Sequence, residues 1–362
     1  MSLLLFLAAA AAQTPHPVPT TPPAVATKAW PTREGDVVLK DFHFRSGETL
    51  PELRMHYTTL GSPHRNAAGV IDNAVMVLHG TGGTGQQFLR PQFADELYGP
   101  GQPLDIRKYW IILPDNIGHV RSSKPSDGLR MKFPKYDYAD MIEAQHRMLT
   151  EGLGIRHMRL IMGTSMGCMH SFMWGEMYPD FSSALMPLAC EPIEIAGLNR
   201  MWRQMLIDGI EKDPAWQSGN YSKEPESGLR TAASILVIAG SAPLNLQKQY
   251  PTREAAKAYV EQAVARDMAG VDADDMIYQF DSSRNYNPWP NLEKIVASMM
   301  WVNSADDFIN PRNLPVPQQA VKRMKNARFR LIPESAETHG HGTHTWAKFW
   351  KADLIELLAR SE

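Results

Sequence analysis

A serine flanked by two glycines lies where an apolar run gives way to a helical pattern. Residues 163–167 read Gly-Thr-Ser-Met-Gly, after an apolar run at 158–162 and before a helix-like stretch at 168–178. A side chain at either glycine would crowd the crossing of strand and helix at so sharp a turn. Five residues of this form occur by chance in many sequences. The strand-to-helix setting nevertheless favours a nucleophilic Ser165 over a structural turn.

The size and composition of the chain limit the classes of protein to which it can belong. With 362 residues, 43% of them hydrophobic, it can bury one large core, alone or with an insertion. A formal net charge of −2 provides no basic field for nucleic acid. No apolar run reaches the length of 18 residues that a membrane span needs. We therefore expect neither a nucleic-acid partner nor a membrane span.

The N-terminus has the pattern of an export signal. Residues 3–12 form an apolar block that ends in Ala10-Ala11-Ala12, which fits the small-x-small rule for cleavage. Residues 1–12 are therefore predicted to be a signal peptide. The missing Lys or Arg before the block leaves a misassigned start or an apolar tail as alternatives. Residues 13–31 contain six prolines and are predicted to be an extended tether. The expected location is periplasmic or secreted.

Two cysteines, Cys168 and Cys190, are too few for a disulfide framework. Cysteine is among the most often buried residues, so two buried thiols are the preferred interpretation. A disulfide between them is the alternative.

Short apolar runs alternate with helical patterns along much of the chain. Eight candidate strands are predicted, at residues 37–44, 53–60, 74–78, 110–113, 158–162, 184–188, 298–302 and 328–332. Helical patterns include residues 138–153 and 345–358. Continuous apolar runs such as 74–78 are typical of central parallel strands that are covered on both faces. The sequence therefore predicts an α/β protein with a mostly parallel eight-stranded sheet.

Residues 191–291 break this alternation. They contain helical patterns at 198–209 and 252–268, separated by polar loops with prolines. We expect a helical lid above the carboxyl ends of the strands, inserted into a core made of residues 32–190 and 292–362. Several of its large side chains could line an apolar acyl pocket, although at helical spacing such residues more often serve packing: Met201, Trp202, Met205, Trp216 and Tyr221.

A serine hydroxyl needs a base to remove its proton, and the base needs an orienting acid. In one known arrangement, the acid and then the histidine follow the serine along the chain. The strand predicted at 298–302 leads into Asp306-Asp307 and then Pro311. Asp307 has the usual four-residue spacing to the proline and is the preferred acid. Asp306 is the alternative, and the aspartate not used is expected to be a loop or cap residue.

The last predicted strand leads into a loop with three histidines. His341 lies between two glycines, which would let the loop bend toward the serine, so it is the preferred base. His339 is then a loop residue and His344 a residue at the start of the last helix. A metal site is less favoured, because the loop has no companion acid or cysteine.

An oxyanion formed on the substrate would need two N–H donors. One is expected from the backbone of Met166, which follows the nucleophile, and the other from Thr81 in the glycine-rich loop at 78–85. The same loop does not fit a phosphate cradle, because no Gly-Lys-Ser/Thr follows it.

Together these elements resemble the α/β-hydrolase superfamily and, more narrowly, the homoserine O-acetyltransferase-like family. The matching segments are residues 56–61, 103–110, 163–167, 213–216, 219–221 and 228–229. The resemblance implies an α/β-hydrolase fold, a Ser165-His341-Asp307 triad, a covalent acyl-enzyme, no cofactor, and a homodimer formed through the lid.

Two departures bear on the reaction. The aspartate that follows the catalytic histidine in the acetyltransferases is Gly342 here, and an exported enzyme would not meet acyl-CoA. We therefore expect a serine hydrolase that cleaves a small-molecule carboxylic ester or, less readily, an amide. An acyl-CoA-dependent O-acyltransferase and a non-catalytic binding protein are the alternatives.

Overall fold

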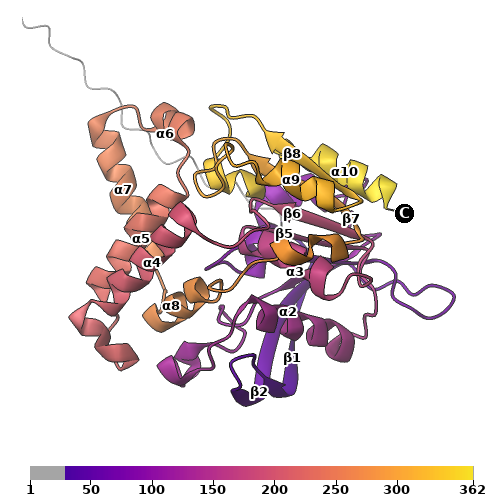
Figure 1. Ribbon diagram of the computed structural model, residues 1–362, viewed down its shortest axis with the longest axis horizontal. Helices are drawn as coiled ribbons and strands as arrows, with labels where there is room; N and C mark the ends of the chain where they lie inside the picture. Colours follow the sequence, from indigo (N-terminus) through magenta and orange to yellow (C-terminus); the bar gives the residue numbers. More distant parts are fainter. Residues whose placement is uncertain (1–28, 362) are drawn as a thin grey trace, which may run out of the picture.

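The computed structural model describes residues 29–361, built around an eight-stranded sheet (Figure 1). Its strands are β1 (Thr32–His43), β2 (Thr49–Leu60), β3 (Ala74–Leu78), β4 (Trp110–Pro114), β5 (Leu160–Thr164), β6 (Ala184–Leu188), β7 (Ser298–Ser304) and β8 (Ala327–Ile332). All eight overlap the runs that predict strands. The predicted signal peptide, residues 1–12, lies outside the described residues, as does the tether up to residue 28.

The strands pair in the order β1-β2-β4-β3-β5-β6-β7-β8. The pairs β1–β2 and β2–β4 are antiparallel, and the remaining five are parallel, which confirms the mostly parallel sheet. The register aligns Leu78 with Gly163 and Ser304 with Ile332. Parallel pairing thus brings the carboxyl ends of β3 and β5, and of β7 and β8, to one edge of the sheet.

Helices cover both faces of the sheet. The first face carries α1 (Pro91–Leu97) and α10 (Lys351–Arg360), and the second carries α2 (Tyr138–Arg147), α3 (Met166–Met177) and α9 (Val316–Arg323). Successive residues of β3 point to opposite faces, as in any strand. Val75 packs in the cluster that contains Phe93 of α1, and Met76 packs in the cluster that contains Phe172 of α3.

Between β6 and β7 the described chain is helical. This insertion comprises α4 (Gly197–Glu211), α5 (Glu226–Ala239), α6 (Pro243–Gln249), α7 (Arg253–Met268) and α8 (Ala273–Asp281), which lie to one side of the sheet (Figure 1). It has its own apolar core, which includes Leu206 and Phe280. Over residues 29–361, no single helix has the length and apolarity to cross a membrane, and the one pair that passes jointly, α5 with α6, is bent by 103°.

Candidate active site

Ser165 occupies a strained turn between β5 and α3. Its backbone has φ 55° and ψ −110°, a conformation that few residues with a side chain adopt. A Cβ at Gly163 would lie 2.3 Å from the Gly167 carbonyl oxygen, and one at Gly167 would lie 2.1 Å from the Leu78 carbonyl oxygen. Both glycines are therefore required by the close crossing of α3 over β3 and β5.

The structure brings Ser165, His341 and Asp307 together. Ser165 Oγ lies 2.8 Å from His341 Nε2, and His341 Nδ1 lies 2.8 Å from Asp307 Oδ2. Asp307 comes from the loop after β7, and His341 comes from the loop after β8. These are hydrogen-bond distances, so the three side chains form a continuous chain from a buried carboxylate to the serine hydroxyl.

The surroundings of Asp307 favour its ionised form. Burial alone would raise its pKa, but the neighbouring His341 and two further donors outweigh this and lower the pKa below its ordinary value. Those donors are the Ile309 N–H at 2.8 Å and the Asn310 side-chain amide at 2.8 Å. The carboxylate is therefore held charged and oriented beneath the imidazole.

Asp306 does not contact the imidazole of His341 but holds the loop that carries it. Its Oδ2 accepts hydrogen bonds from the Thr338 hydroxyl at 2.8 Å and the Gly340 N–H at 3.0 Å. It thus anchors the loop that carries His341, and Asp307 makes the contact with the imidazole itself.

The other two histidines of this loop lie apart from Ser165. The His344 ring is nearly perpendicular to that of His341 at 5.1 Å, and burial lowers its pKa to about 3. The His339 ring stacks on Trp346 at 4.2 Å. Within residues 29–361, no group of three or more His, Cys, Asp or Glu side chains is arranged to hold a metal ion.

The glycine-rich loop after β3 passes close to Ser165, since a Cβ at Gly80 would lie 3.2 Å from that of Ser165. Thr81 is the next residue of this loop. Met166 is the first residue of α3, a position whose N–H has no partner within the helix. Of the two predicted oxyanion donors, Met166 directly follows Ser165, and Thr81 directly follows Gly80 on the loop after β3.

Two buried histidines hold this loop, and sequence reasoning missed their role. His79 Nδ1 donates to the Gly80 carbonyl at 2.8 Å, while its Nε2 accepts from the Asn116 N–H at 3.1 Å. His119 Nε2 accepts from the Gly82 N–H at 3.3 Å. Burial lowers the pKa of both rings, which keeps them neutral and able to accept. The His-Gly pair at 79–80 was a visible signal, whereas nothing in the sequence marked His119.

The preferred interpretation of the cysteines as two buried thiols is wrong, and the alternative, a bridge between them, is what the structure shows. Cys168, in the first turn of α3, forms a disulfide with Cys190, which directly follows β6. Their Cα atoms are 5.8 Å apart, within the range of bridged pairs. The two positions are distant along the chain, and only the packing of α3 against β6 makes them neighbours.

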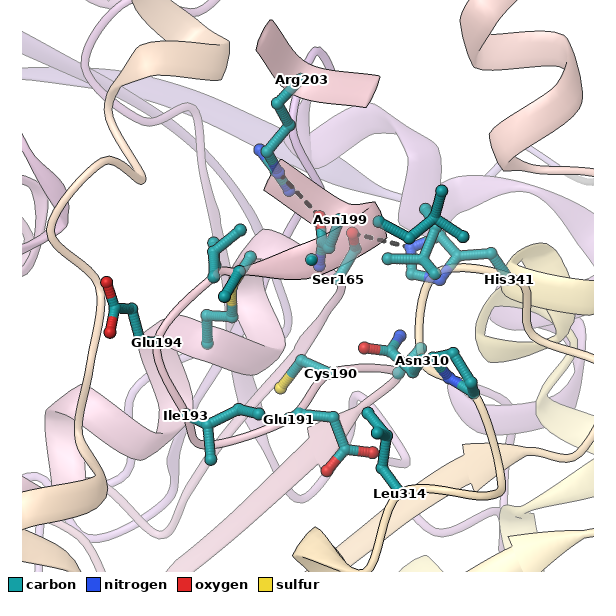
Figure 2. Close-up of a pocket in the computed structure, with 18 residues that line it drawn as sticks. Ser165, Cys190, Glu191, Ile193, Glu194, Asn199, Arg203, Asn310, Leu314 and His341 are labelled. Atoms are coloured by element: carbon teal, nitrogen blue, oxygen red, sulfur yellow. Dashed lines mark hydrogen bonds between the residues drawn. The ribbon is translucent and has the colours of Figure 1, made fainter. Parts of the chain in front are cut away.

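A cavity of about 380 Å³ opens beside Ser165 and His341 (Figure 2). Most of its wall comes from residues 189–199 and 309–314, together with Met169 and Arg203. None of the five large lid side chains predicted as candidates for an acyl pocket lines it. Met201 and Met205 are exposed, and Trp202 is packed in the core of the insertion.

Arg203 is an unexpected feature of this cavity. Its side chain is buried, yet over residues 29–361 it forms no ion pair with a carboxylate. The guanidinium bonds Asn199 Oδ1 at 2.9 Å and Ser283 Oγ at 3.3 Å, and it lies over the rings of Trp202 and Phe280. Burial lowers its pKa, although an arginine remains charged.

Glu191 is a second ionisable group in the cavity wall. One of its oxygens accepts from the Asn303 amide at 3.0 Å, and the other is buried without a hydrogen-bond partner. Burial, together with the nearby Asp307 charge, raises the pKa of Glu191 to about 8.

Comparison with known proteins identifies the fold family of the chain. Residues 73–338 match the family model described as alpha/beta hydrolase fold. A homoserine O-acetyltransferase of Moorella thermoacetica is 34% identical over 217 residues, which are 54% of this chain and 55% of that protein. The chain thus aligns with little more than half of that relative. One from Solidesulfovibrio magneticus is 31% identical over 308 residues, covering 80% of this chain and 74% of its own length.

Solved structures share the fold. The homoserine O-acetyltransferase from Bacillus anthracis has a TM-score of 0.78 at 20% identity and covers 90% of this chain and 97% of its own. An acetylester hydrolase from Corynebacterium glutamicum has a TM-score of 0.79 at 20% identity, with 90% of this chain and 96% of its own covered. The chain belongs to the α/β-hydrolase fold family, and within that family it is homoserine O-acetyltransferase-like.

Proposed function

We propose that this protein is a serine hydrolase that cleaves a carboxylic ester or, less readily, an amide through an acyl-enzyme. The observation that carries the proposal is the pair of 2.8 Å contacts that join Asp307 to His341 and His341 to Ser165. Such a chain activates a hydroxyl that is otherwise a weak nucleophile.

The proposed reaction has two halves. Ser165 Oγ attacks the ester carbonyl while His341 Nε2 takes its proton, and Asp307 stabilises the imidazolium. The N–H groups of Met166 and Thr81 donate to the oxyanion. Collapse breaks the bond to the alcohol oxygen, which receives the proton from His341. Water then attacks the acyl-enzyme with His341 as base, releasing the carboxylic acid and restoring Ser165.

An O-acyltransferase reaction is the second candidate. It would use the same acyl-enzyme but pass the acyl group to an alcohol. Two observations favour it: the relatives named homoserine O-acetyltransferase, and the buried Arg203, whose charge would suit an acceptor that carries a carboxylate. Gly342, in place of the aspartate of the acetyltransferases, favours water instead.

Two assays separate the candidates. The protein is incubated with p-nitrophenyl acetate and, separately, with acetyl-CoA plus homoserine. Hydrolysis supports the first candidate, whereas CoA release that depends on homoserine, without ester turnover, supports the second. Ser165→Ala should lower kcat/KM by at least about a thousandfold in whichever assay is active. Full activity in that variant would remove the mechanism.

We further propose that the protein works in the periplasm or outside the cell. The apolar block at residues 3–12 and the Cys168–Cys190 disulfide support this, because disulfides persist in oxidising compartments. N-terminal sequencing of the mature protein tests the idea, since a terminus at Met1 or Ser2 would count against cleavage.

A further inference from the structure

We infer that the acyl group which this site accepts is an unbranched apolar chain of about five to eight carbons rather than acetyl, seated in the cavity beside Ser165. The inference rests on the proposed function, because it takes Ser165 as the residue that is acylated. It concerns the size and polarity of the group on that serine.

The volume of the cavity is the first argument. It measures about 380 Å³ and opens directly beside Ser165 and His341. A methylene group takes up roughly the space of a water molecule, on the order of 30 Å³. An acetyl group would therefore leave most of the cavity empty or filled with water, whereas a chain of about eight carbons would fill more than half of it.

The chemistry of the wall is the second argument. The larger apolar side chains of the wall include Met169, Ile193, Ile195, Ile309, Pro311 and Leu314. Water held against such a surface is released when an apolar chain enters, and each buried methylene contributes about 0.8 kcal/mol, or about fourfold in kcat/KM. A two-carbon acyl group would make little use of this surface.

The wall is also formed before substrate arrives. Ile193 and Ile195 pack against the main apolar core. Cys190, which lines the cavity beside them, is tied to α3 by the disulfide and accepts at its carbonyl oxygen from Trp301 Nε1 at 3.0 Å. A preformed apolar site binds a chain without first paying to order its own residues.

The two sides of Ser165 differ in charge, which assigns the side without the guanidinium to the acyl chain. Figure 2 shows Asn199 and Arg203 on one side of Ser165, and Ile193 and Leu314 on the other. Glu191 lies between Ile193 and Leu314, and burial raises its pKa to about 8, so it is uncharged near neutral pH. The first two residues come from α4 of the insertion, whereas the other side belongs to segments that follow β6 and β7. The hydroxyl-bearing partner of the reaction fits the first side and a hydrocarbon chain fits the second.

Two ester series test the inference. In the first, p-nitrophenyl esters carry acyl chains of two, four, six, eight and sixteen carbons. We expect kcat/KM to rise about fourfold per methylene up to about eight carbons and then to fall as the cavity is filled. In the second, ethyl to octyl acetates keep the acyl group constant, and we expect kcat/KM to vary by less than about threefold.

Substitutions in the cavity wall test whether the chain-length preference arises there. Leu314→Trp puts a large ring at a partly exposed position of the wall and should shorten the cavity. The ratio of kcat/KM for the octanoate to that for the acetate should fall at least about tenfold. Ile193→Trp is a second variant with the same expected result. Leu244→Trp, on α6 outside the cavity, is the matched control and should leave the ratio unchanged.

The outcomes distinguish this inference from the proposed function. Turnover that depends on Ser165 but is fastest with the acetyl ester would overturn the inference alone. A chain-length effect in the acetate series, without one in the acyl series, would also overturn it, because the side without the guanidinium would then hold the alcohol. No ester turnover that depends on Ser165 would instead remove the hydrolase proposal.

Discussion

At the scale of single residues, Glu191 makes the stability of the protein depend on pH. Its pKa is raised from 4.5 to about 8, so the folded state holds this proton over a range in which the unfolded chain loses it. The free energy of unfolding is therefore unaffected by Glu191 below pH 4.5, the ordinary pKa of a glutamate, and it falls as the pH rises from there toward 8. Glu191→Gln removes this loss. We expect the variant to gain at least about 1 kcal/mol over the parent at pH 8, and little at pH 4.5.

Thermal unfolding of both proteins at several pH values measures this gain as a difference in Tm. Glu194→Gln is the matched control, since its side chain lies three residues away but is exposed. A gain that is the same at pH 4.5 and pH 8 would contradict the assigned burial of the Glu191 charge.

The residues of the site differ in how far the sequence could identify them. Ser165, Asp307 and His341 each follow a strand in the expected order, so their positions along the chain carry the signal. Glu191 and Arg203 follow no such rule. Their interest comes from burial beside Ser165, which depends on the path of the chain after β6 and on how α4 packs. Such tertiary burial leaves no local pattern.

At the scale of elements, the loop with His341 rests against the insertion. Gly340 has φ 56°, and a Cβ there would lie 2.4 Å from the Ser241 carbonyl oxygen, in the turn between α5 and α6. Asn245 of α6 also donates to the Ala336 carbonyl at 3.1 Å. Gly340→Ala should therefore displace the loop, lower kcat about tenfold or more, and cost about 1–3 kcal/mol of stability.

Steady-state kinetics and thermal unfolding measure both effects. Gly342→Ala provides the comparison, because its φ is not positive and the nearest atom to the new Cβ is 3.7 Å away. Equal losses in the two variants would show that the contact with Ser241 does not hold the loop.

The disulfide joins two elements of the site, α3 and the end of β6. It closes a loop across a sequence separation of 22, which corresponds to about 3 kcal/mol of stabilisation in the chain-entropy model. We expect dithiothreitol to lower the Tm of the parent. The double variant Cys168→Ala, Cys190→Ala should show the lower Tm without reductant and no further change with it. An unchanged Tm of the reduced parent would indicate that the bridge adds no stability.

The boundaries of elements show where sequence patterns stop being informative. The helical pattern at residues 345–358 predicts a helix from residue 345, but α10 begins at Lys351, because Gly340–Thr345 and Ala347–Phe349 form two tighter 3-10 helices. Met158 falls within the strand predicted at residues 158–162 but forms only an isolated bridge to Ser182. In both places the residues are apolar or helix-compatible, and tertiary packing decides the backbone path.

At the scale of the whole molecule, the insertion is a candidate surface for self-association. The resemblance predicts a homodimer formed through the lid, and α4 exposes two large apolar side chains one turn apart: Met201 is 59% and Met205 57% exposed. Burying such a stripe against a second copy would remove apolar surface from water. We expect the double variant Met201→Lys, Met205→Lys to be monomeric at concentrations where the parent is dimeric, because four added charges would face each other across a two-fold interface.

Sedimentation velocity at about 1 and 50 μM measures the mass of each protein across the range in which a weak dimer dissociates. Ile355→Lys is the control, since Ile355 is 52% exposed on α10, away from the insertion, and its replacement should leave the dimer intact. A parent that is monomeric at 50 μM would contradict the prediction. A dimer that persists in the α4 variant but dissociates in Ile355→Lys would move the interface to α10 and leave Met201 and Met205 exposed in the assembled protein.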